Sequence, residues 1–504
     1  MSKLIACIAS ALCCLGFITP TYANYDVEVK PYKQRGYPAL PDVSQYTEAF
    51  FYDHLAKWTH KADVTLERLP EQHLIRRYRL VNDMQAQAKA QGGIPEVLVV
   101  SDGIATLQDI SSRYPNALVH KSKEGKDIYL AKFPILVKGS AAILVSKNQE
   151  LRLSEERHTF LVGGGEFFVL SGAVKSWRES TQTPSYWTGD KDAYRAFYTG
   201  WNGSRTYFYD STFESLGYWN VKAYGVTLTS TSLSVNERTS MPWIKDDIAT
   251  GVLMKNKFID VYYGFYCYKA QDVVILENEY IKNIVYGIDP HDYSERLIIA
   301  RNRTWGTLIK HGIIISREVN NSFIFENVSY DNTRSGIMLD RTSLNNVIAK
   351  NTAYNNGGDG LTVQESNYNL VWDNLFYNNK QHGINVRNSQ HVRLYDNTVF
   401  ANGGAGIYGH VNNLADHTHR KLYLDPFETK VSIDVRGGKL IANAGGAINV
   451  SEFEYAKIAE VALGDNGEKP GQPFKGDLTP YNRQILNSHR AGHYLKLNSK
   501  NGVN

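Results

Sequence analysis

The sequence predicts an all-β protein whose fold is a parallel β-helix, a solenoid in which every coil adds short strands to long parallel sheets. Three observations favour this fold. Glycine and asparagine recur in two separate columns that keep step through seven repeats of 22 to 25 residues. Each repeat holds strand-patterned pieces that are too short for helices. The 504-residue chain is also rich in tyrosine (33) and glycine (40) and poor in proline (15), which is typical of β structure with many turns.

The two columns lie in the segment 250–410, where the repeat is clearest. The glycines are Gly264, Gly287, Gly312, Gly336, Gly360, Gly383 and Gly406, and the asparagines are Asn256, Asn278, Asn302, Asn327, Asn351, Asn374 and Asn397. The first and third positions after each glycine are nearly always apolar, as at Ile313 and Ile315, so one face of each strand is predicted to be buried. Asparagine at a fixed turn position predicts a ladder of amides that are hydrogen-bonded from coil to coil. Weaker strand-like segments extend the predicted β-helix to 95–460.

Residues 1–23 are predicted to form a signal peptide. Lys3 precedes an uncharged apolar stretch, and Thr21-Tyr22-Ala23 places small residues where a signal peptidase cuts, so the mature chain would begin at Asn24. The apolar stretch is too short to span a membrane comfortably. Three of the four cysteines leave with this segment, and Cys267 alone forms no internal disulfide. We therefore expect an exported protein without a membrane span after signal cleavage, in a bacterial periplasm.

Three further segments surround the predicted solenoid. Residues 24–94 are predicted to be an N-terminal cap region, in which an amphipathic helix over His73–Gln91 covers the open end. Residues 461–504 begin with a stretch containing proline and glycine and are predicted to be a linker and tail. An insertion near 180–220 is dense in aromatic residues. It is either a lid or wall that stacks on sugar rings, or a hydrophobic plug packed on the solenoid.

Outward-facing positions of one strand stack from coil to coil about 4.8 Å apart, which makes a surface suited to an extended polymer. Positions two, four and five after the repeat glycines gather histidine, arginine and carboxylates. The polar residues at these positions are Asp289, His291, Asp292, Ser316, Arg317, Asp340, Arg341, Gln364, Glu365, Asn385, Arg387, Asn388, Tyr408 and His410. We interpret them as a candidate active face; the alternative is a solvated surface with salt bridges between coils.

With 55 Lys+Arg against 51 Asp+Glu and no basic run, a nucleic-acid binder is not expected.

The motif Asp289-Pro290-His291-Asp292 is the sharpest local feature of this face. Asp289 and His291 are two residues apart, so both side chains leave the same side of a strand, and the carboxylate is expected to fix the imidazole tautomer. Arg317 lies 26 residues on, about one coil, and is expected beside His291. A base next to a fixed cation suits removal of a proton α to a carboxylate. Metal ligation by Asp289, His291 and Asp292 is the alternative, although no second histidine stands at ligand spacing.

These residues indicate an extended polyuronate substrate and leave three functions open. Epimerisation and β-elimination begin with the same carbanion-like species. A lyase also needs an acid for the C4 oxygen, for which His410 and Tyr408 are candidates several coils from His291. A non-catalytic scaffold that binds the polysaccharide during export would use the same groove.

The chain also resembles a known family. The segments that carry the resemblance are Asp289-Pro-His-Asp292, His311-Gly-Ile-Ile-Ile-Ser-Arg317, Ser335-Gly-Ile-Met-Leu-Asp-Arg341, Gly358-Asp-Gly-Leu-Thr-Val-Gln-Glu365 and His382-Gly-Ile-Asn-Val-Arg387. Over essentially the whole mature chain it resembles the periplasmic mannuronan C5-epimerases of bacterial alginate biosynthesis, the AlgG type. The resemblance implies a right-handed parallel β-helix and an isomerase that converts β-D-mannuronate to α-L-guluronate within polymannuronate.

The resemblance further implies roles for single residues. His291 is the implied general base for the C5 proton, Arg317 the neutraliser of the C6 carboxylate and Asp289 a supporting residue, with water as the expected acid. Substrate binding on the active face is expected from Asp292, Asp340, Arg341, Gln364, Glu365, Arg387 and His410. No cofactor or metal is expected, and calcium in particular is not expected to be obligatory, because the acidic glycine-rich repeats of the secreted calcium-dependent epimerases are missing. The expected partners are the anionic polysaccharide and other periplasmic proteins of alginate synthesis and export.

Overall fold

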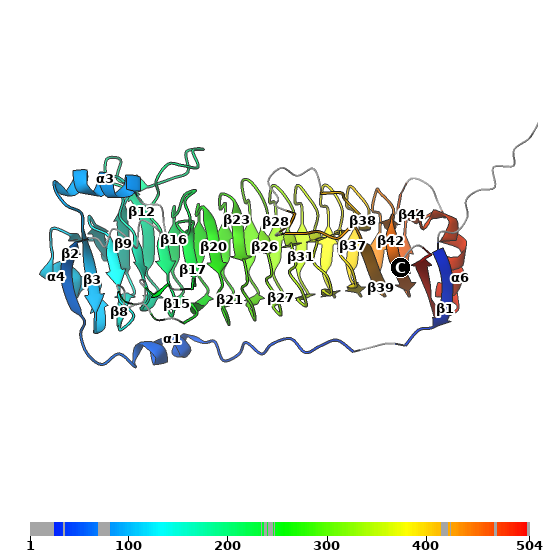
Figure 1. Cartoon of the computed structure of the whole chain (residues 1–504), viewed down its shortest axis with the longest axis horizontal. Coiled ribbons are helices and arrows are strands. Elements are labelled where there is room, and N and C mark those ends of the chain that lie inside the picture. The colour runs from blue at the N-terminus through cyan, green and yellow to red at the C-terminus, as the bar shows by residue number, and fades with distance from the viewer. Residues whose placement is uncertain are drawn as a thin grey trace, which may run out of the picture.

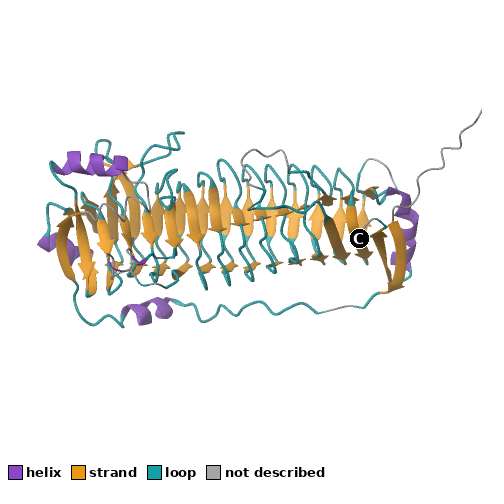
Figure 2. Cartoon of the chain, in the orientation of Figure 1, coloured by secondary structure: helices purple, strands orange, loops and turns teal. Residues whose placement is uncertain are grey.

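The computed structural model describes residues 25–500, apart from 34–35, 69–80, 233, 236–238, 240–244, 246, 415–421, 424 and 468–470. The predicted signal peptide therefore lies outside the described residues. The described chain forms a right-handed parallel β-helix, as predicted, with its coils stacked along the longest axis (Figure 1). Strands line the sides of the coils, and the few helices lie at the ends and flanks (Figure 2).

Three long sheets run along the solenoid. Sheet A contains, from the N-terminal end, β4 (Gly103–Thr106), β8 (Ala141–Val145), β11 (Glu166–Leu170), β15 (Arg205–Tyr209), β18 (Thr250–Met254), β21 (Val274–Leu276), β24 (Ile298–Ala300), β27 (Phe323–Phe325), β30 (Val347–Ala349), β33 (Leu370–Trp372), β36 (Val392–Tyr395), β39 (Val431–Arg436), β42 (Phe453–Ala459), β45 (His493–Ser499) and β1 (Tyr25–Pro31). Sheet B contains β2 (Asp63–Arg68), β3 (Glu96–Ser101), β7 (Ile135–Val137), β10 (Leu161–Gly163), β14 (Tyr198–Gly200), β17 (Gly225–Thr229), β20 (Tyr263–Tyr268), β23 (Tyr286–His291), β26 (Ile313–Ser316), β29 (Ile337–Asp340), β32 (Leu361–Gln364), β35 (Ile384–Arg387), β38 (Ile407–His410), β41 (Ile448–Val450) and β44 (Phe474–Gly476). Sheet C contains β5 (Leu118–Lys123), β6 (Lys126–Ala131), β9 (Gln149–Ser154), β12 (Ala173–Arg178) with β13 (Thr183–Pro184) beside it, β16 (Thr212–Glu214), β19 (Lys257–Ile259), β22 (Glu279–Ile281), β25 (Arg303–Trp305), β28 (Val328–Tyr330), β31 (Thr352–Tyr354), β34 (Leu375–Tyr377), β37 (Thr398–Phe400), β40 (Lys439–Ile441) and β43 (Ala462–Gly464).

The helices are short. They are α1 (Glu48–Leu55), α3 (Val81–Gln91), α4 (Leu107–Arg113), the 3₁₀ turn η1 (Thr479–Tyr481) and α6 (Asn482–Arg490). Within the described ranges, none of them has the length and apolar character needed to cross a bilayer.

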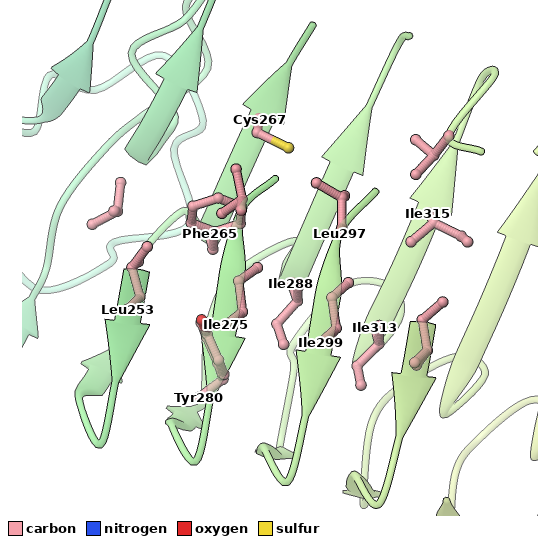
Figure 3. Close-up of a cluster of buried hydrophobic side chains, with 14 of the residues drawn as sticks. Leu253, Phe265, Cys267, Ile275, Tyr280, Ile288, Leu297, Ile299, Ile313 and Ile315 are labelled. Carbon is pink, nitrogen blue, oxygen red and sulfur yellow. The ribbon is translucent and has the colours of Figure 1, made fainter. Parts of the chain in front are cut away.

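Inward-facing apolar side chains stack from coil to coil to form the core. Leu253, Ile275 and Ile299 follow one another in sheet A, and Ile288 and Ile313 do so in sheet B (Figure 3). All five are fully buried. This is the period-two pattern that the sequence predicts, and it leaves the alternate positions of sheet B facing outward.

The asparagine column forms the predicted ladder at the corner between sheets A and C. The side-chain amide of Asn278 donates to Oδ1 of Asn302 at 3.0 Å, and Asn302 donates to Oδ1 of Asn327 at 2.9 Å. A second ladder, which the sequence analysis did not identify, lies between sheets C and B. It runs through Asn332, Asn356, Asn379, Asn402, Asn443 and Asn466. Both ladders satisfy polar groups that the corners of the coils bury.

The repeat glycines begin the strands of sheet B because neighbouring coils approach closely there. A Cβ on Gly287 would lie 2.5 Å from the carbonyl oxygen of Gly312, and one on Gly383 would lie 2.0 Å from Cγ1 of Val399. Only a residue without a Cβ fits these positions.

The described residues of the predicted N-terminal cap region, 24–94, do not gather at one end. Its first strand, β1, lies at the C-terminal end and pairs antiparallel with β45. The chain then runs back along the solenoid to the other end, through α1 (Figure 1). On the way Tyr37 stacks on Trp372 with 4.5 Å between ring centroids, and Phe51 is fully buried. Residues 36–58 are therefore a strap over apolar side chains of sheet A.

The N-terminal end of the solenoid is covered by α4, whose Ile110 is fully buried (Figure 1). The described part of the predicted cap helix, His73–Gln91, is α3, and the eight residues before it lie outside the described residues. Gln87 of α3 donates to the carbonyl oxygen of His158 at 2.7 Å, which ties α3 to the flank of the first coils. A helix closes this end as expected, but that helix is α4, whose seven residues are too few for a clear pattern.

The described residues of 461–504 fold as part of the solenoid and its end, and not as the predicted linker and tail. They add β43 and β44 to sheets C and B, and α6 and β45 close the C-terminal end. Ile485 of α6 and Leu495 and Leu497 of β45 are fully buried in the core. The prediction was wrong because this segment lacks the glycine and asparagine columns, and its apolar residues cover the end of the solenoid instead of building a coil.

Most aromatic residues of the predicted insertion near 180–220 belong to the core. The strands β14, β15 and β16 within it are regular members of the three sheets, and Phe197, Trp201 and Phe213 are buried. For these residues the hydrophobic interpretation is correct. Tyr186 and Trp219, 51% and 47% exposed, lie outside the strands.

Candidate active site

Sheet B brings the predicted active face together. Position four after each repeat glycine pairs with the same position on the next coil. This line of residues runs from His291 through Ser316, Asp340, Gln364 and Arg387 to His410. Since neighbouring strands lie about 4.8 Å apart, the line is a continuous polar track along the solenoid.

Asp292 lies at the centre of the predicted catalytic group. Its Oδ2 is 2.8 Å from Nδ1 of His291, and its Oδ1 is 3.6 Å from a terminal nitrogen of Arg317. The strand β23 ends at His291, and the backbone of Asp292 has a φ of 25°, so the chain turns out of the sheet at this point. We call His291, Asp292 and Arg317 the reaction centre. The side chain of Arg317 is 48% exposed and is open to a ligand.

This placement corrects the role expected of Asp289. Asp292, and not Asp289, contacts Nδ1 of His291, and this contact of 2.8 Å has the distance of an ion pair but not the geometry of a hydrogen bond. The carboxylate of Asp292 is therefore the one placed to orient the ring and to leave Nε2 open. Burial favours the neutral imidazole, but Asp292 and Asp289 outweigh burial and raise the pKa of His291 above its usual value. Burial also disfavours charge on Asp292, yet His291 and Arg317 lower its pKa overall, so this carboxylate stays ionised.

Asp289 is a buried carboxyl group beside the base. It is 1% exposed, and neither of its oxygens has a hydrogen-bond partner among the described residues. Burial raises the pKa of Asp289 to about 7, although His291 opposes this shift. Asp289 pairs in register with Tyr266, whose ring centroid is 5.8 Å from that of His291. An unpaired buried carboxyl group costs free energy, and its neutral form, which the raised pKa favours, costs less.

A cavity of about 430 Å³ opens over sheet B. Its lining residues are Tyr286, Ile309, Lys310, His311, Ile314, Arg334, Ser335, Met338, Asp340, Gly358, Asp359, Thr362, Gln364, Gln381, Asn385 and Arg387. Three predicted binding residues, Asp340, Gln364 and Arg387, line it. His291 does not, but it pairs in register with Ser316, and Ser316 pairs with Asp340 of the lining. The reaction centre therefore lies at the edge of a groove that has the volume of a ligand site.

The other predicted binding residues lie where the strands end. Arg341 is 3.6 Å from Asp340 and 3.7 Å from Asp425. The amide of Gln364 donates to Glu365 at 3.2 Å. These contacts are salt bridges and hydrogen bonds along the predicted active face. Part of that face therefore matches the alternative considered above, a solvated surface with salt bridges between coils.

His410 ends the polar track and stacks on Tyr408 at 4.5 Å. Burial, together with Arg387 and His382, lowers the pKa of His410 to about 4, so its imidazole is neutral. His410 lies five strand pairings from His291. Neither His410 nor Tyr408 is therefore placed to act as an acid on a sugar at the reaction centre.

The sequence analysis missed one wall of the cavity. Its residues occupy the two positions before the repeat glycines and include Lys310, His311, Arg334, Ser335 and Asp359. The backbone N–H of Ser335 donates to Nδ1 of His311 at 3.1 Å, and burial lowers the pKa of His311 to about 3, so this ring is a neutral Nε2–H donor. Lys310 and Arg334 add positive charge. The sequence does contain a pattern from which this wall could have been predicted. The positions before the repeat glycines stack from coil to coil just as the positions after them do.

The described residues contain no group of three or more histidine, cysteine, aspartate or glutamate side chains arranged to hold a metal ion. Asp289, His291 and Asp292, considered above as ligands, are not such a group.

The curated relatives and the solved structures that match most of this chain agree on one family, and a family model with another description matches its central coils. A family model described as periplasmic copper-binding protein (NosD) matches residues 221–414, which hold the most regular coils. A mannuronan C5-epimerase of Pseudomonas putida is 39% identical over 469 residues, covering 92% of this chain and 88% of the relative. The mannuronan C5-epimerase AlgG of Azotobacter vinelandii is 42% identical over 397 residues, covering 79% and 74%. A crystal structure of the periplasmic alginate epimerase AlgG matches with a TM-score of 0.78 and 38% identity, covering 86% of this chain and 99% of that one.

Proposed function

Because this chain belongs to the mannuronan C5-epimerase family, we propose that it is a periplasmic isomerase of alginate biosynthesis. It converts β-D-mannuronate residues to α-L-guluronate within polymannuronate. The observation that carries the proposal is the placement of Asp292 between His291 and Arg317 at the edge of a groove over sheet B. This puts a base and a cation side by side, which is what proton abstraction α to a carboxylate requires.

In the first step, Nε2 of His291 takes the proton from C5. Asp292 on Nδ1 stabilises the imidazolium that forms. The electron pair left at C5 delocalises into the C6 carboxylate, and the guanidinium of Arg317 neutralises the added charge. By analogy with oxyanion donors, such a charge contact contributes about 3–4 kcal/mol. A positioned base contributes roughly 10²–10⁴-fold.

In the second step, water delivers a proton to the opposite face of C5, and the hydroxide formed takes the proton from His291. The base is thereby restored, and the glycosidic bond is never broken. No contact in the described residues favours β-elimination, because the candidate acids His410 and Tyr408 lie five strand pairings away.

The groove suits an anionic polysaccharide. Lys310 and Arg334 on one wall and Arg387 on the other provide positive charge for uronate carboxylates. Asp340 and Gln364 provide hydrogen-bonding groups for sugar hydroxyls. Other periplasmic proteins that synthesise and export alginate would act on the same polymer and are the expected protein partners.

Proton NMR of polymannuronate incubated with the purified protein in D₂O tests this function. The expected result is guluronate with deuterium at C5, unaltered chain length, and no effect of a chelator. An unsaturated product that absorbs in the ultraviolet would identify a lyase instead, and binding without C5 exchange would identify a scaffold. The His291→Ala protein is expected to bind the polymer and lose exchange; exchange that persists would contradict the assignment of the base.

A further inference from the structure

Lys222 lies beside the reaction centre. The sequence analysis did not identify it as a site residue. It stands between β16 and β17 in a left-handed backbone conformation, with a φ of 65°. The hydroxyl of Thr199 donates to its carbonyl oxygen at 2.8 Å, and the next residue, Ala223, is fully buried. The position of Lys222 is thus set by packing against the solenoid.

The ammonium group of Lys222 rests on two tyrosines of β20. Nζ is 3.3 Å from the ring centroid of Tyr268 and 3.3 Å from the hydroxyl oxygen of Tyr266. In the register of sheet B, Tyr268 pairs with His291 and Tyr266 pairs with Asp289. The ammonium therefore lies on the outer face of sheet B, one coil before the base.

Within the described part of the chain, this cation has aromatic and hydroxyl neighbours but no ion-pair partner. Among the residues that the structure describes, no carboxylate oxygen lies within the 4.0 Å of an ion pair from Nζ. Asp292, which faces it, is already engaged by His291 and Arg317. Burial lowers the pKa of Lys222 to about 7, and the more distant Asp292 and Asp289 only partly oppose this. A desolvated cation without a carboxylate favours the binding of an anion.

Lys222 and Arg317 stand on opposite sides of His291. Lys222 rests on β20, and Arg317 follows β26, two coils further on. At about 4.8 Å per coil, the two cations are separated by roughly 10 Å along the direction of the groove. A polyuronate carries one carboxylate on every sugar. When Arg317 holds the carboxylate of the sugar under conversion, a neighbouring carboxylate of the extended chain lies on the side of Lys222.

We propose that Lys222 binds the carboxylate of a uronate next to the one at His291 and so sets the register of the polymer over the base. This inference rests on the proposed function and deepens it at the same site. Lys222 is then a substrate-binding residue, and the chemical step remains with the reaction centre.

The test compares Lys222→Met, Lys222→Arg and the control Lys257→Met. Lys257 carries the same charge but lies on β19 of sheet C, where its side chain is 58% exposed and 3.8 Å from Glu279. Two quantities are measured: the Kd of polymannuronate by isothermal titration calorimetry, and the initial rate of C5 exchange over a range of polymer concentrations.

For Lys222→Met we expect Kd and KM to rise about 10- to 100-fold, which is the loss of one hydrogen bond to a charged group. The value of kcat should change much less, because His291 and Arg317 are untouched. Lys222→Arg should recover most of the affinity, and the difference between variants should shrink at high salt. Lys257→Met should match the wild type. If Lys222→Met is recovered unfolded, Lys222→Gln, which keeps a stem over Tyr268, carries the same expectation.

Two outcomes would overturn the inference. One is a folded Lys222→Met or Lys222→Gln protein with wild-type Kd and KM. The other is a fall in kcat with unchanged Kd, since this would place Lys222 in the chemistry or the scaffold. A wild-type protein that binds polymannuronate without C5 exchange would refute the proposed function instead, and Lys222→Met would still be expected to weaken binding.

Discussion

Replacing Asp292 with asparagine tests the arrangement on which the mechanism depends. The substitution keeps the shape of the side chain but removes the negative charge that lies 2.8 Å from Nδ1 of His291 and 3.6 Å from Arg317. In the transition state the imidazole becomes an imidazolium, and its charge contact with Asp292 is expected to contribute about as much as a hydrogen bond to a charged group, about 1.5–3 kcal/mol. Since about 1.4 kcal/mol is tenfold in rate, kcat is expected to fall about 10- to 150-fold.

The same substitution shifts the pH dependence in a fixed direction. Burial lowers the pKa of His291, and Asp292 with Asp289 raises it above its usual value. Without Asp292, burial has more influence, so the pKa of His291 falls and the neutral base persists to lower pH. The acid limb of kcat/KM should therefore move to lower pH while its plateau drops.

Initial rates of deuterium incorporation at C5, measured by NMR across the acidic and neutral range, check both effects. Asp272→Asn is the matched control, because the side chain of Asp272 is 62% exposed and pairs with Arg296 on the surface. A folded Asp292→Asn protein with the kcat of the wild type and an unmoved acid limb would refute the assignment of Asp292 as the partner of His291.

Three further predictions follow from other contacts. Arg317→Leu should abolish turnover, and Arg317→Lys should retain only a little of it, because a point charge lacks the bidentate fork of a guanidinium. Normal turnover of Arg317→Leu in the NMR assay would exclude Arg317 as the group that neutralises the carboxylate. The neutral ring of His291 is the base, and its pKa is raised above the usual value. The kcat/KM of the wild type should therefore fall as the pH drops through the neutral region. A kcat/KM that stays constant at acidic pH would contradict a catalytic histidine. Asn302→Ala should lower the free energy of unfolding by about 3 kcal/mol, because it leaves buried hydrogen-bonding partners at Asn278, Ile275 and Asn327 unsatisfied. Urea unfolding measures this change, and an unshifted urea midpoint would show that the ladder adds no stability.

The sequence predicts the parts of the fold that repeat. Gly287 and Asn302 belong to columns whose period fixes the coil, and the period-two pattern after each glycine fixes which residues face outward. From this alone, the register that places His291, Ser316 and Asp340 in one line could be predicted. The ends could not be predicted, because β1 pairs with a strand more than four hundred residues away and no local pattern encodes that partner.

The site was predicted in its residues but not in its contacts. Spacing along an extended strand favours Asp289 as the partner of His291, since both leave the same side. The strand ends at His291, however, and the left-handed backbone of Asp292 places its carboxylate on the imidazole. Lys222 escaped prediction for a different reason, because it reaches the face from a loop that does not share the repeat.

The pairing of β1 with β45 has a consequence for how the protein is made. Residues 25–31 leave the ribosome more than four hundred residues before 493–499, so β1 has no partner until all the coils between them have been made. The ring of Tyr25 stacks on Phe453 at 4.1 Å, and its hydroxyl donates to Asp477, so it fills a place that exists only once the far end is built. A prematurely terminated chain would wind its coils yet leave its own beginning unburied, and a protease could recognise it by that exposed segment.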